Sequence, residues 1–154
     1  SKDSLSINTT SSYVILKNLG IGQTTENFLN TKSGFTLDMQ TKFIDLSYTT
    51  GETWTLTLGL GIPLQQFLSI WLPQNNLGGN GKITTGSNTE YKSSNVSGGG
   101  HFAIFGLEWG IFEFLVGHRV NNVEYSKWES GSTTIDIKYK VSVSQSMVGL
   151  GLSF

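Results

Sequence analysis

The two histidines are the side chains best suited to acid–base chemistry in this chain, because imidazole titrates close to neutral pH. His118 is followed by Glu124 and Ser126, which are the other residue types of a hydrolytic group. Neither His118 nor His101 has a serine within the next two positions, and His118 shares its strand parity with Phe112. We therefore expect a histidine at the rim of an apolar surface, and no catalytic residues.

Other patterns for ligand binding are weak. The stretch GGNGKI (78–83) differs from a phosphate-binding loop, because Asn76 stands where the first glycine is required and Ile83 replaces Ser or Thr. The sequence has no cysteine, and two histidines alone make a poor transition-metal site. We expect no cofactor and no metal. The net charge of −1 gives no reason to expect nucleic acid as a partner.

A balanced set of charged residues lies on the polar side of the expected strands. Buried charges persist only when they are paired and hydrogen-bonded, and four acids and four bases could neutralise one another. The sequence therefore predicts a polar network inside a barrel, made of Asp38, Gln40, Lys42, Glu108, Glu113, Arg119, Asp136, Lys138 and Lys140. The alternative places the same residues on the solvated face of a soluble barrel.

The strands that would position these residues have unusual faces. In WTLTLGLGIP (54–63), large apolar residues at even positions alternate with Thr and Gly. Successive side chains point to opposite sides of a sheet, and a soluble strand usually carries longer polar residues on its solvated face. The C-terminal stretch MVGLGLSF repeats the pattern. The interior of a narrow closed barrel is cramped, so the small residues are expected inside and the bulky ones outside.

An apolar exterior is stable only in lipid. The residues expected to face lipid are Trp54, Leu56, Leu58, Leu60, Phe105, Leu107, Trp109, Phe112, Phe114, Val148, Leu150, Leu152 and Phe154. Several Trp and Tyr residues fall near expected strand ends, as in the aromatic girdles of membrane barrels.

Composition is typical of neither a well-solvated surface nor an ordinary core. Charged residues make up 14% of the chain, against roughly 25% in soluble domains. Glycine accounts for 19 of 154 residues, well above the usual share of about 7%. Residues 53–81 carry no charge, but Pro63 and the Thr/Gly alternation interrupt any helix long enough to span a membrane. A Gly/Ser/Thr-rich extracellular β-sandwich is the alternative on composition alone.

The expected strands number six, and a further hairpin would make eight. The six are 12–17, 35–48, 53–62, 98–109, 111–127 and 133–154. Long connections (18–34 and 63–97) alternate with short ones, as in outer-membrane barrels. Segments 64–72 and 82–92 could supply the hairpin, although 64–72 also has helical spacing after a proline. The sequence thus predicts one domain, 1–154, that forms a closed antiparallel up-and-down transmembrane β-barrel of eight strands.

Two strands change the parity of their apolar residues. In 35–48, apolar residues occupy odd positions up to Phe43 and even positions from Ile44. In 133–154, the change falls near Gln145. A β-bulge would reconcile the two phases, and a break into two strands at SVSQS is the alternative.

The C-terminal part of the chain resembles a known family. The ending SQSMVGLGLSF resembles the C-terminal signature of bacterial outer-membrane β-barrels, and FGLEWGIFEFLVGHRVNNVEYSKW resembles the penultimate hairpin of small OmpA/OmpX-type barrels. The resemblance covers 98–154 well and 35–62 loosely. It implies a bacterial outer-membrane location and a C-terminal strand that is read by the barrel-assembly machinery. Some small outer-membrane barrels act on lipid A, but neither histidine shows the His-x-Ser spacing of the lipid A deacylases.

We therefore expect a small outer-membrane β-barrel, not an enzyme, with a plugged polar interior. It would act through its polar loops in surface interaction, adhesion or envelope support, since loops presented to water carry function. The expected partners are outer-membrane lipid and lipopolysaccharide, the barrel-assembly machinery and an unidentified surface partner. A soluble calyx-type barrel with a hydrophobic ligand is the main alternative. A lipid A-modifying enzyme and a narrow pore are the others.

Overall fold

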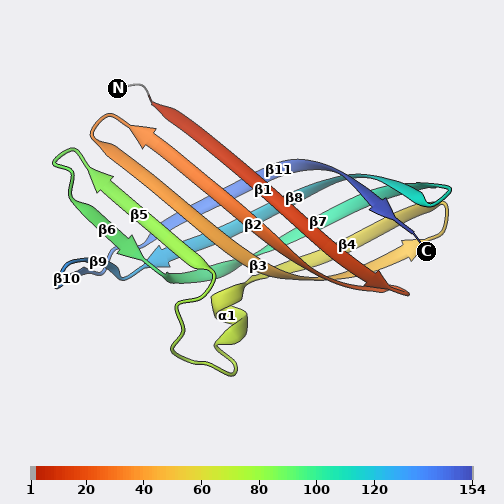
Figure 1. Ribbon diagram of the computed structural model, residues 1–154, viewed down its shortest axis with the longest axis horizontal. Coiled ribbons are helices and arrows are strands. Elements are labelled where there is room, and N and C mark those ends of the chain that lie inside the picture. The colour runs from red at the N-terminus through yellow and green to blue at the C-terminus, as the bar shows by residue number, and fades with distance from the viewer. Residues whose placement is uncertain (1–2, 154) are drawn as a thin grey trace.

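The computed structural model describes residues 3–153 and is all-β, with one short helix (Figure 1). The elements are β1 (Ser4–Leu16), β2 (Leu19–Lys32), β3 (Phe35–Gly51), β4 (Trp54–Pro63), α1 (Leu64–Leu68), β5 (Gly79–Thr85), β6 (Glu90–Ser93), β7 (Asn95–Trp109), β8 (Phe112–Ser126), β9 (Trp128–Ser130), β10 (Thr133–Ile135) and β11 (Tyr139–Leu152). All strands belong to one antiparallel up-and-down sheet.

The strand β3 is the branching point of this sheet. One of its edges pairs with β2 along residues 35–48. Its other edge pairs with β5 over residues 35–41 and with β4 over residues 43–51, so β4 and β5 follow one another along the same edge. The chain between them forms α1 and a loop that project sideways from the sheet (Figure 1). The sheet continues through β4, β7, β8 and β11 on one side and β5, β6, β9 and β10 on the other.

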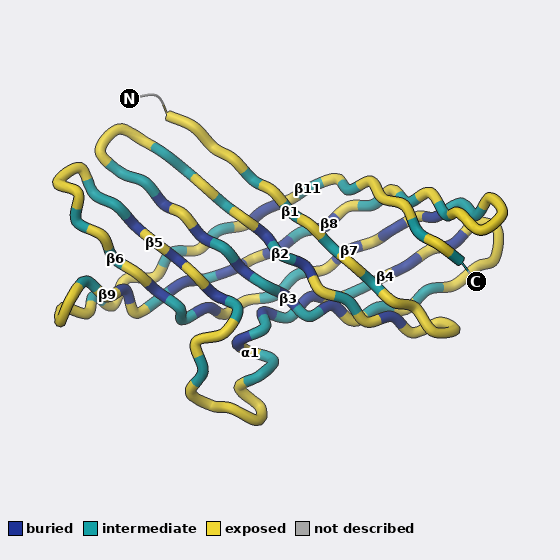
Figure 2. Tube along the Cα trace, viewed as in Figure 1, coloured by how far each residue is buried: buried dark blue, intermediate teal, exposed yellow. Residues whose placement is uncertain are grey.

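In the two halves of the curled sheet, the large apolar side chains lie on opposite faces. Three two-residue turns, 17–18, 52–53 and 110–111, lie at one end of the strands. Near these turns the large apolar side chains point outward, and we call this part the apolar half. Toward the other end the exterior is polar and the interior holds the hydrophobic core, and we call this part the polar half. Figure 2 shows buried and exposed residues alternating along the strands of both halves.

In the apolar half the sheet ends at β1 and β11, and both of these edge strands run in the same direction. Each neighbouring pair from β1 through β2, β3, β4, β7 and β8 to β11 is antiparallel, which gives the seventh strand the direction of the first. Among residues 3–153, no backbone pairing joins β1 to β11. A side-chain hydrogen bond from Thr9 to Gln145 connects the two edges. The sheet is therefore curled and is not closed.

The segment 18–34, expected as a loop, forms the long strand β2 instead. Its inward positions carry Gly20, Gly22, Thr24 and Glu26, so the strand lacks the apolar alternation by which strands are usually identified. The segment 64–72 contains the helix α1, in agreement with its helical spacing. The segment 128–132, which lies between two of the expected strands, contains β9 and a turn.

Neither a bulge nor a break occurs where the apolar parity changes. Odd-numbered residues of β3 face inward from Leu37 to Asp45, and β3 keeps one register with β2 throughout. The ladder between β11 and β8 is likewise continuous from Tyr139 to Leu152. Both alternatives from the sequence were therefore wrong. The surroundings change instead, because the side of the strand that is apolar switches from the interior in the polar half to the exterior in the apolar half.

The hydrophobic core lies inside the polar half. It contains Leu37, Met39, Phe43, Ile83, Val96, Val123, Tyr125 and Trp128. The Tyr125 hydroxyl donates to the Gln40 carbonyl at 2.8 Å and contacts the Thr41 hydroxyl at 2.8 Å. Burial raises the pKa of Tyr125 to about 12. In residues 3–153 there is no helix long and apolar enough to cross a membrane.

Candidate functional site

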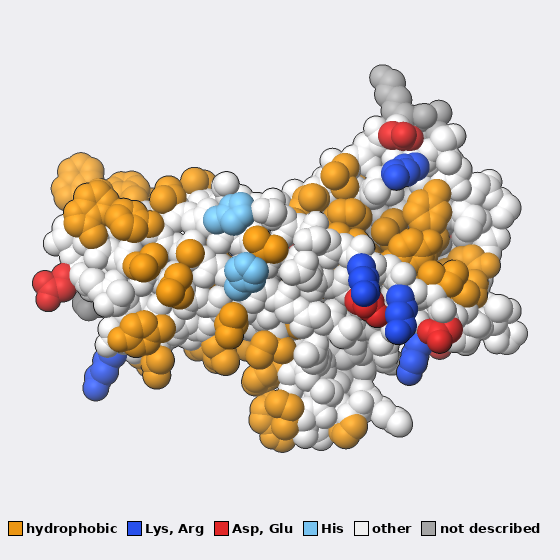
Figure 3. Space-filling model, turned by 180° about the vertical axis from the view of Figure 1, so that it is seen from behind, with side chains coloured by type: hydrophobic (Ala, Val, Ile, Leu, Met, Phe, Trp, Pro, Cys, Tyr) orange, Lys and Arg blue, Asp and Glu red, His pale blue; other side chains and the backbone are white. Residues whose placement is uncertain are grey.

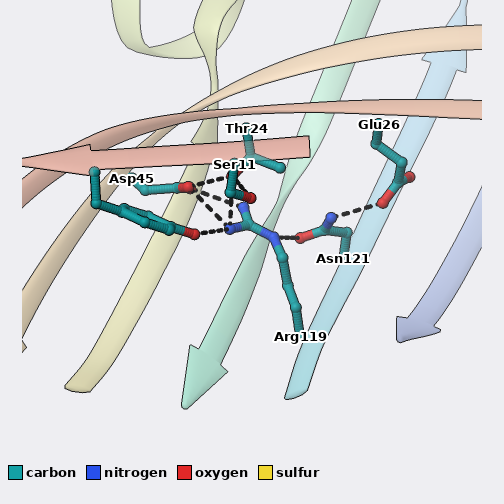
Figure 4. Close-up of polar contacts among 7 residues, drawn as sticks. Ser11, Thr24, Glu26, Asp45, Arg119 and Asn121 are labelled. Carbon is teal, nitrogen blue, oxygen red and sulfur yellow. Dashed lines mark hydrogen bonds and ion pairs between the residues drawn. The ribbon is translucent and has the colours of Figure 1, made fainter. Parts of the chain in front are cut away.

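The interior of the apolar half is filled around Arg119, whose side chain is 1% exposed. Its guanidinium pairs with the carboxylate of Asp45 at two points, with Nη2–Oδ1 at 2.7 Å and Nη1–Oδ2 at 2.9 Å. Thr24 accepts a hydrogen bond from Nη1 at 3.0 Å and donates one to Asp45. Figure 4 shows Asp45 and Arg119 pointing toward each other, from β3 and β8 respectively. This two-point geometry is the strong form of an ion pair, and it neutralises both buried charges.

The network extends from Arg119 toward the polar half. Arg119 Nε donates to Asn121 Oδ1 at 2.7 Å, and Asn121 Nδ2 donates to Glu26 Oε2 at 2.6 Å. Burial raises the pKa of Glu26 above its ordinary value, while the Asn121 hydrogen bond and the Arg119 charge act in the opposite direction. The rings of Phe43 and Phe102 lie 5.2 Å and 5.1 Å from Arg119 Cζ, within the range of cation–π attraction.

The small residues of β4 make room for this interior. A Cβ atom at Gly61 would lie 2.8 Å from Asp45 Oδ1 and closer still to Arg119 Nη2, and a Cβ at Gly59 would overlap the ring of Phe102. The glycines found by alternation are thus the positions against which the largest interior side chains pack.

The structure places few of the predicted interior residues in this network. Arg119 is at its centre, and half-buried Glu113 accepts a separate hydrogen bond from Thr55 at 2.9 Å. Glu108 is half-buried. The interior assignment fails for Asp38, Gln40, Lys42, Asp136, Lys138 and Lys140, which point outward or lie exposed. For the three residues of β3, the reason is that the apolar residues of 35–43 face inward, so their polar alternates face solvent. Asp136 and Lys138 lie outside the strands, between β10 and β11.

The two acidic residues of the Arg119 network were not predicted from the sequence. Asp45 and Glu26 were not considered, because Asp45 falls where the parity change made the facing of β3 ambiguous and Glu26 falls in the segment taken as a loop. Glycine and threonine at the inward positions of β2 and β4 are the signal that could have identified them.

The residues expected to face lipid lie on the outer face of the apolar half. Leu58 is 57% exposed and Leu150 74%. The other exposed members are Trp54, Leu56, Leu60, Phe105, Trp109, Phe112, Phe114, Val148 and Leu152. Leu107 is half-buried, and Phe154 lies outside the described residues.

The two histidines lie on the outer face, next to one another across β7 and β8. His101 pairs with Val120 and Ala103 with His118, so the two imidazoles are diagonal neighbours. In Figure 3 both lie between a region rich in hydrophobic side chains and a group of charged ones. His118 Nε2 is 2.7 Å from Ser144 Oγ on β11. No other side-chain hydrogen bond to His118 occurs within residues 3–153, so the pair lacks the third group that orients a catalytic base.

Glu124 and Ser126 take no part in this pair. Glu124 lies 3.7 Å from the ammonium of Lys140, and Ser126 donates to Asn95 at 2.9 Å. Among the described residues, no group of three or more His, Asp or Glu side chains could hold a metal ion.

A large cleft lies on the outside of the polar half. Its volume is about 1260 Å³, and it is lined by strands β3, β5 and β6 and by the projecting segment 64–78. On the side of the strands, the cleft is lined by the amides of Asn27, Gln40 and Asn80. The charged residues of the lining are Asp38, Lys82, Lys92, Lys127 and Glu129. The other side carries Gln65, Gln66, Gln74, Asn75 and Asn76. This concentration of amides is unlike a hydrophobic pocket and matches a ligand rich in hydroxyl groups, because an amide donates and accepts at once.

The chain was compared with known proteins at three levels. No protein-family model, no curated protein and no solved structure matches it.

Proposed function

We propose that this chain forms a small β-barrel of the bacterial outer membrane, with a filled interior, and acts at its polar end in surface interaction, adhesion or envelope support. One observation carries the proposal. In the apolar half, large apolar side chains point outward from β1, β2, β3, β4, β7, β8 and β11, while the interior holds Gly, Thr and the Arg119–Asp45 ion pair. Water would penalise such an exterior, whereas lipid favours it.

The proposed barrel closes by joining the edges β1 and β11, which lipid cannot solvate. Seven strands cross the apolar half, and β1 and β11 run in the same direction and are connected by the hydrogen bond from Thr9 to Gln145, so direct closure would give a seven-stranded barrel with one parallel pair. The eight strands expected from the sequence, which is the even number typical of bacterial outer-membrane barrels, would need an additional strand between these edges, and residues 3–153 supply none. The short turns, which lie at the end of the apolar half, would then face the periplasm.

The expected partners follow from the same arrangement. Outer-membrane lipid and lipopolysaccharide would contact the apolar half, and the C-terminal strand β11, which ends in alternating Val148, Leu150 and Leu152, would be read by the barrel-assembly machinery. An unidentified surface partner would meet the polar end.

The alternative of a soluble calyx-type barrel is less well supported. Such a barrel needs its apolar strand faces inside, around the ligand. In β4 the residues Leu56, Leu58 and Leu60 are 41%, 57% and 63% exposed.

The proposal is tested by extraction and gel migration. We expect the protein to require detergent for solubility, and to migrate differently before and after heating, because a closed barrel resists unfolding by detergent at room temperature. A monomer that stays soluble without detergent would contradict the proposal and support the calyx.

The strand number has its own test, which is simplified by the absence of native cysteine. Cysteines introduced at Thr9 and Gln145 need Cβ atoms about 3.5–4.5 Å apart to form a disulfide. Because the Thr9 and Gln145 side chains are hydrogen-bonded to each other, we expect efficient cross-linking in the heat-modifiable protein. Absence of a disulfide would mean that an additional strand separates β1 from β11 by twice the usual spacing of about 4.8 Å.

The lipid-facing side is tested by Leu58→Arg. A charge on the lipid face near the bilayer midplane costs about 2–4 kcal/mol of folding free energy. The matched control is Ser142→Arg, since Ser142 also points outward but lies in the polar half. Equal effects of the two substitutions on urea unfolding in lipid vesicles would argue against a bilayer around the apolar half.

A further inference from the structure

We propose that the cleft between segment 64–78 and the outer face of β3, β5 and β6 binds the phosphorylated sugar headgroup of a glycolipid in the surrounding leaflet. The inference rests on the proposed function, and it assigns a ligand to one particular surface of the polar half.

The wall of the cleft is held rigidly by its own amides. Gln65 accepts from the Val96 backbone N–H at 2.7 Å and donates to the Asn75 carbonyl at 2.6 Å. Gln66 accepts from the Gly98 N–H at 3.1 Å, and the Lys42 N–H donates to the Gly78 carbonyl at 2.8 Å. Segment 64–78 is thus fastened at both ends to β7 and β3. A site formed before the ligand arrives loses less entropy on binding.

Other amides are left for a ligand. Gln74, Asn76 and Asn80 line the cleft and form no side-chain hydrogen bond with any residue of 3–153. On the strand side, Gln40 Nε2 donates to Asn27 Oδ1 at 2.9 Å, and both amides keep further donors and acceptors free. Several amides that each donate and accept suit the neighbouring hydroxyl groups of a sugar ring.

The ammonium groups of two lysines line the same cleft as these amides. Lys82 and Lys92 are directly opposite each other on β5 and β6, and both point outward into the cleft. Like charges in this position repel each other. Asp38 is opposite Lys82, and Glu129 is opposite Lys92, so the two lysines lie side by side between two carboxylates. Lys82 also forms an ion pair with Glu90 at 3.5 Å. A phosphate between the two ammonium groups would relieve their repulsion and form charge-assisted hydrogen bonds.

The cleft lies next to the proposed edge of the bilayer, and this position favours a lipid headgroup over a free sugar as its ligand. Below the amides, the outer face of β3 becomes apolar at Ile44 and Leu46, where the proposed bilayer begins. Segment 64–78 projects sideways at this level (Figure 1), and its tip exposes Ile70, Trp71 and Leu72. Exposed Trp and apolar residues are typical of the membrane interface. A ligand in the cleft would therefore lie in the headgroup layer, with its acyl chains along the apolar half.

The test compares three probes with the detergent-solubilised protein, which keeps the full chain. The probes are intact lipopolysaccharide in mixed micelles, the same lipopolysaccharide after removal of its phosphates, and the lipid-free core oligosaccharide. We expect the intact lipid to bind most tightly, and loss of phosphate or of the acyl chains to weaken binding roughly tenfold or more.

The double substitution Lys82→Gln/Lys92→Gln should weaken binding of the intact lipid by a similar factor. Lys138→Gln is the matched control, because Lys138 is exposed outside the cleft, and it should leave the affinity within about twofold. Unchanged binding by the double variant, or equal binding of the lipid-free oligosaccharide, would overturn the inference. If the protein requires detergent and is heat-modifiable, either of these results contradicts the binding site alone and leaves the proposed barrel unaffected. A protein that is soluble without detergent would contradict both the barrel and the binding site.

Discussion

Arg119, on β8, links opposite walls of the molecule through contacts with three other strands. Its partners Asp45, Thr24 and Asn121 lie on β3, β2 and β8, and Tyr13 of β1 lies 3.4 Å from Nη1. The presence of Arg119 in a polar interior could be predicted from its parity with small residues. Its partner Asp45 could not be predicted, because the sequence offers several carboxylates. Which of them meets Arg119 depends on the strands that face each other across the interior, and this is a property of the whole sheet.

Removing one member of the buried pair should be severely destabilising. We expect Asp45→Asn to lower the free energy of unfolding by about 3–5 kcal/mol, because Arg119 keeps a buried charge without compensation. The double variant Asp45→Asn/Arg119→Gln should cost less than the sum of the single changes, as measured by urea unfolding in detergent. Additive costs would show that the two groups do not interact.

Glu26 should make stability depend on pH. It lies beyond the apolar half, on the polar side of the Arg119 network. Because its pKa is raised from the ordinary value of 4.5 in the folded state, the folded protein holds a proton that the unfolded chain releases, and stability falls as pH rises above about 4.5.

The variant Glu26→Gln keeps an acceptor for Asn121 and removes the titration. Relative to the wild type, its free energy of unfolding should rise as pH increases from about 4.5 to 8. A difference that stays constant across this range in urea titrations would contradict a raised pKa.

At the scale of single elements, several of the long strands could be recognised from the sequence, but which of their faces points inward could not be fully predicted. Alternation in 54–63 gave the outward side of β4 directly, because one face carries nothing larger than Thr. In β3 and β11 a parity change was interpreted as a defect in the strand, whereas each strand is regular and passes between two environments. Periodicity reports which side is apolar, and it cannot tell whether that side lies inside or outside.

The glycines of the inward faces should differ in their tolerance of a methyl group. Gly59→Ala places a Cβ against the ring of Phe102, and such overpacking typically costs about 1–3 kcal/mol. The matched control is Gly149→Ala on β11, where the nearest atoms, those of Leu115, are 3.6 Å and 3.7 Å from the added Cβ. We expect the control to lie close to the wild type in urea unfolding. Equal losses would mean that Phe102 does not pack on Gly59.

For the whole molecule, the class of the fold followed from composition and alternation, while the number of strands did not. The all-β, antiparallel, up-and-down sheet was predicted, and β2 was missed because its inward residues serve the Arg119 network instead of a hydrophobic core. The cleft was also beyond prediction. One side comes from segment 64–78 and the other from the outer face of β3, β5 and β6, and the two sides meet because β4 and β5 both pair with β3.

A filled interior should not conduct ions. Arg119, Asp45 and Thr24 are at most 1% exposed, and rings of Phe43 and Phe102 cover the guanidinium. We expect no discrete single-channel steps when the protein is inserted into planar bilayers. Regular conductance steps that disappear on heat denaturation would show an open passage and contradict the packing around Arg119.

The placement of the hydrophobic core in the polar half alone has a thermodynamic consequence. In the proposed setting, only this half transfers apolar surface from water when it folds, because the outer residues of the other half stay among acyl chains. The heat-capacity change of unfolding within the bilayer should therefore be small for 154 residues, and cooling should loosen the extracellular end first. The stability of the extracellular end would therefore depend more strongly on temperature than the stability of the membrane-embedded end.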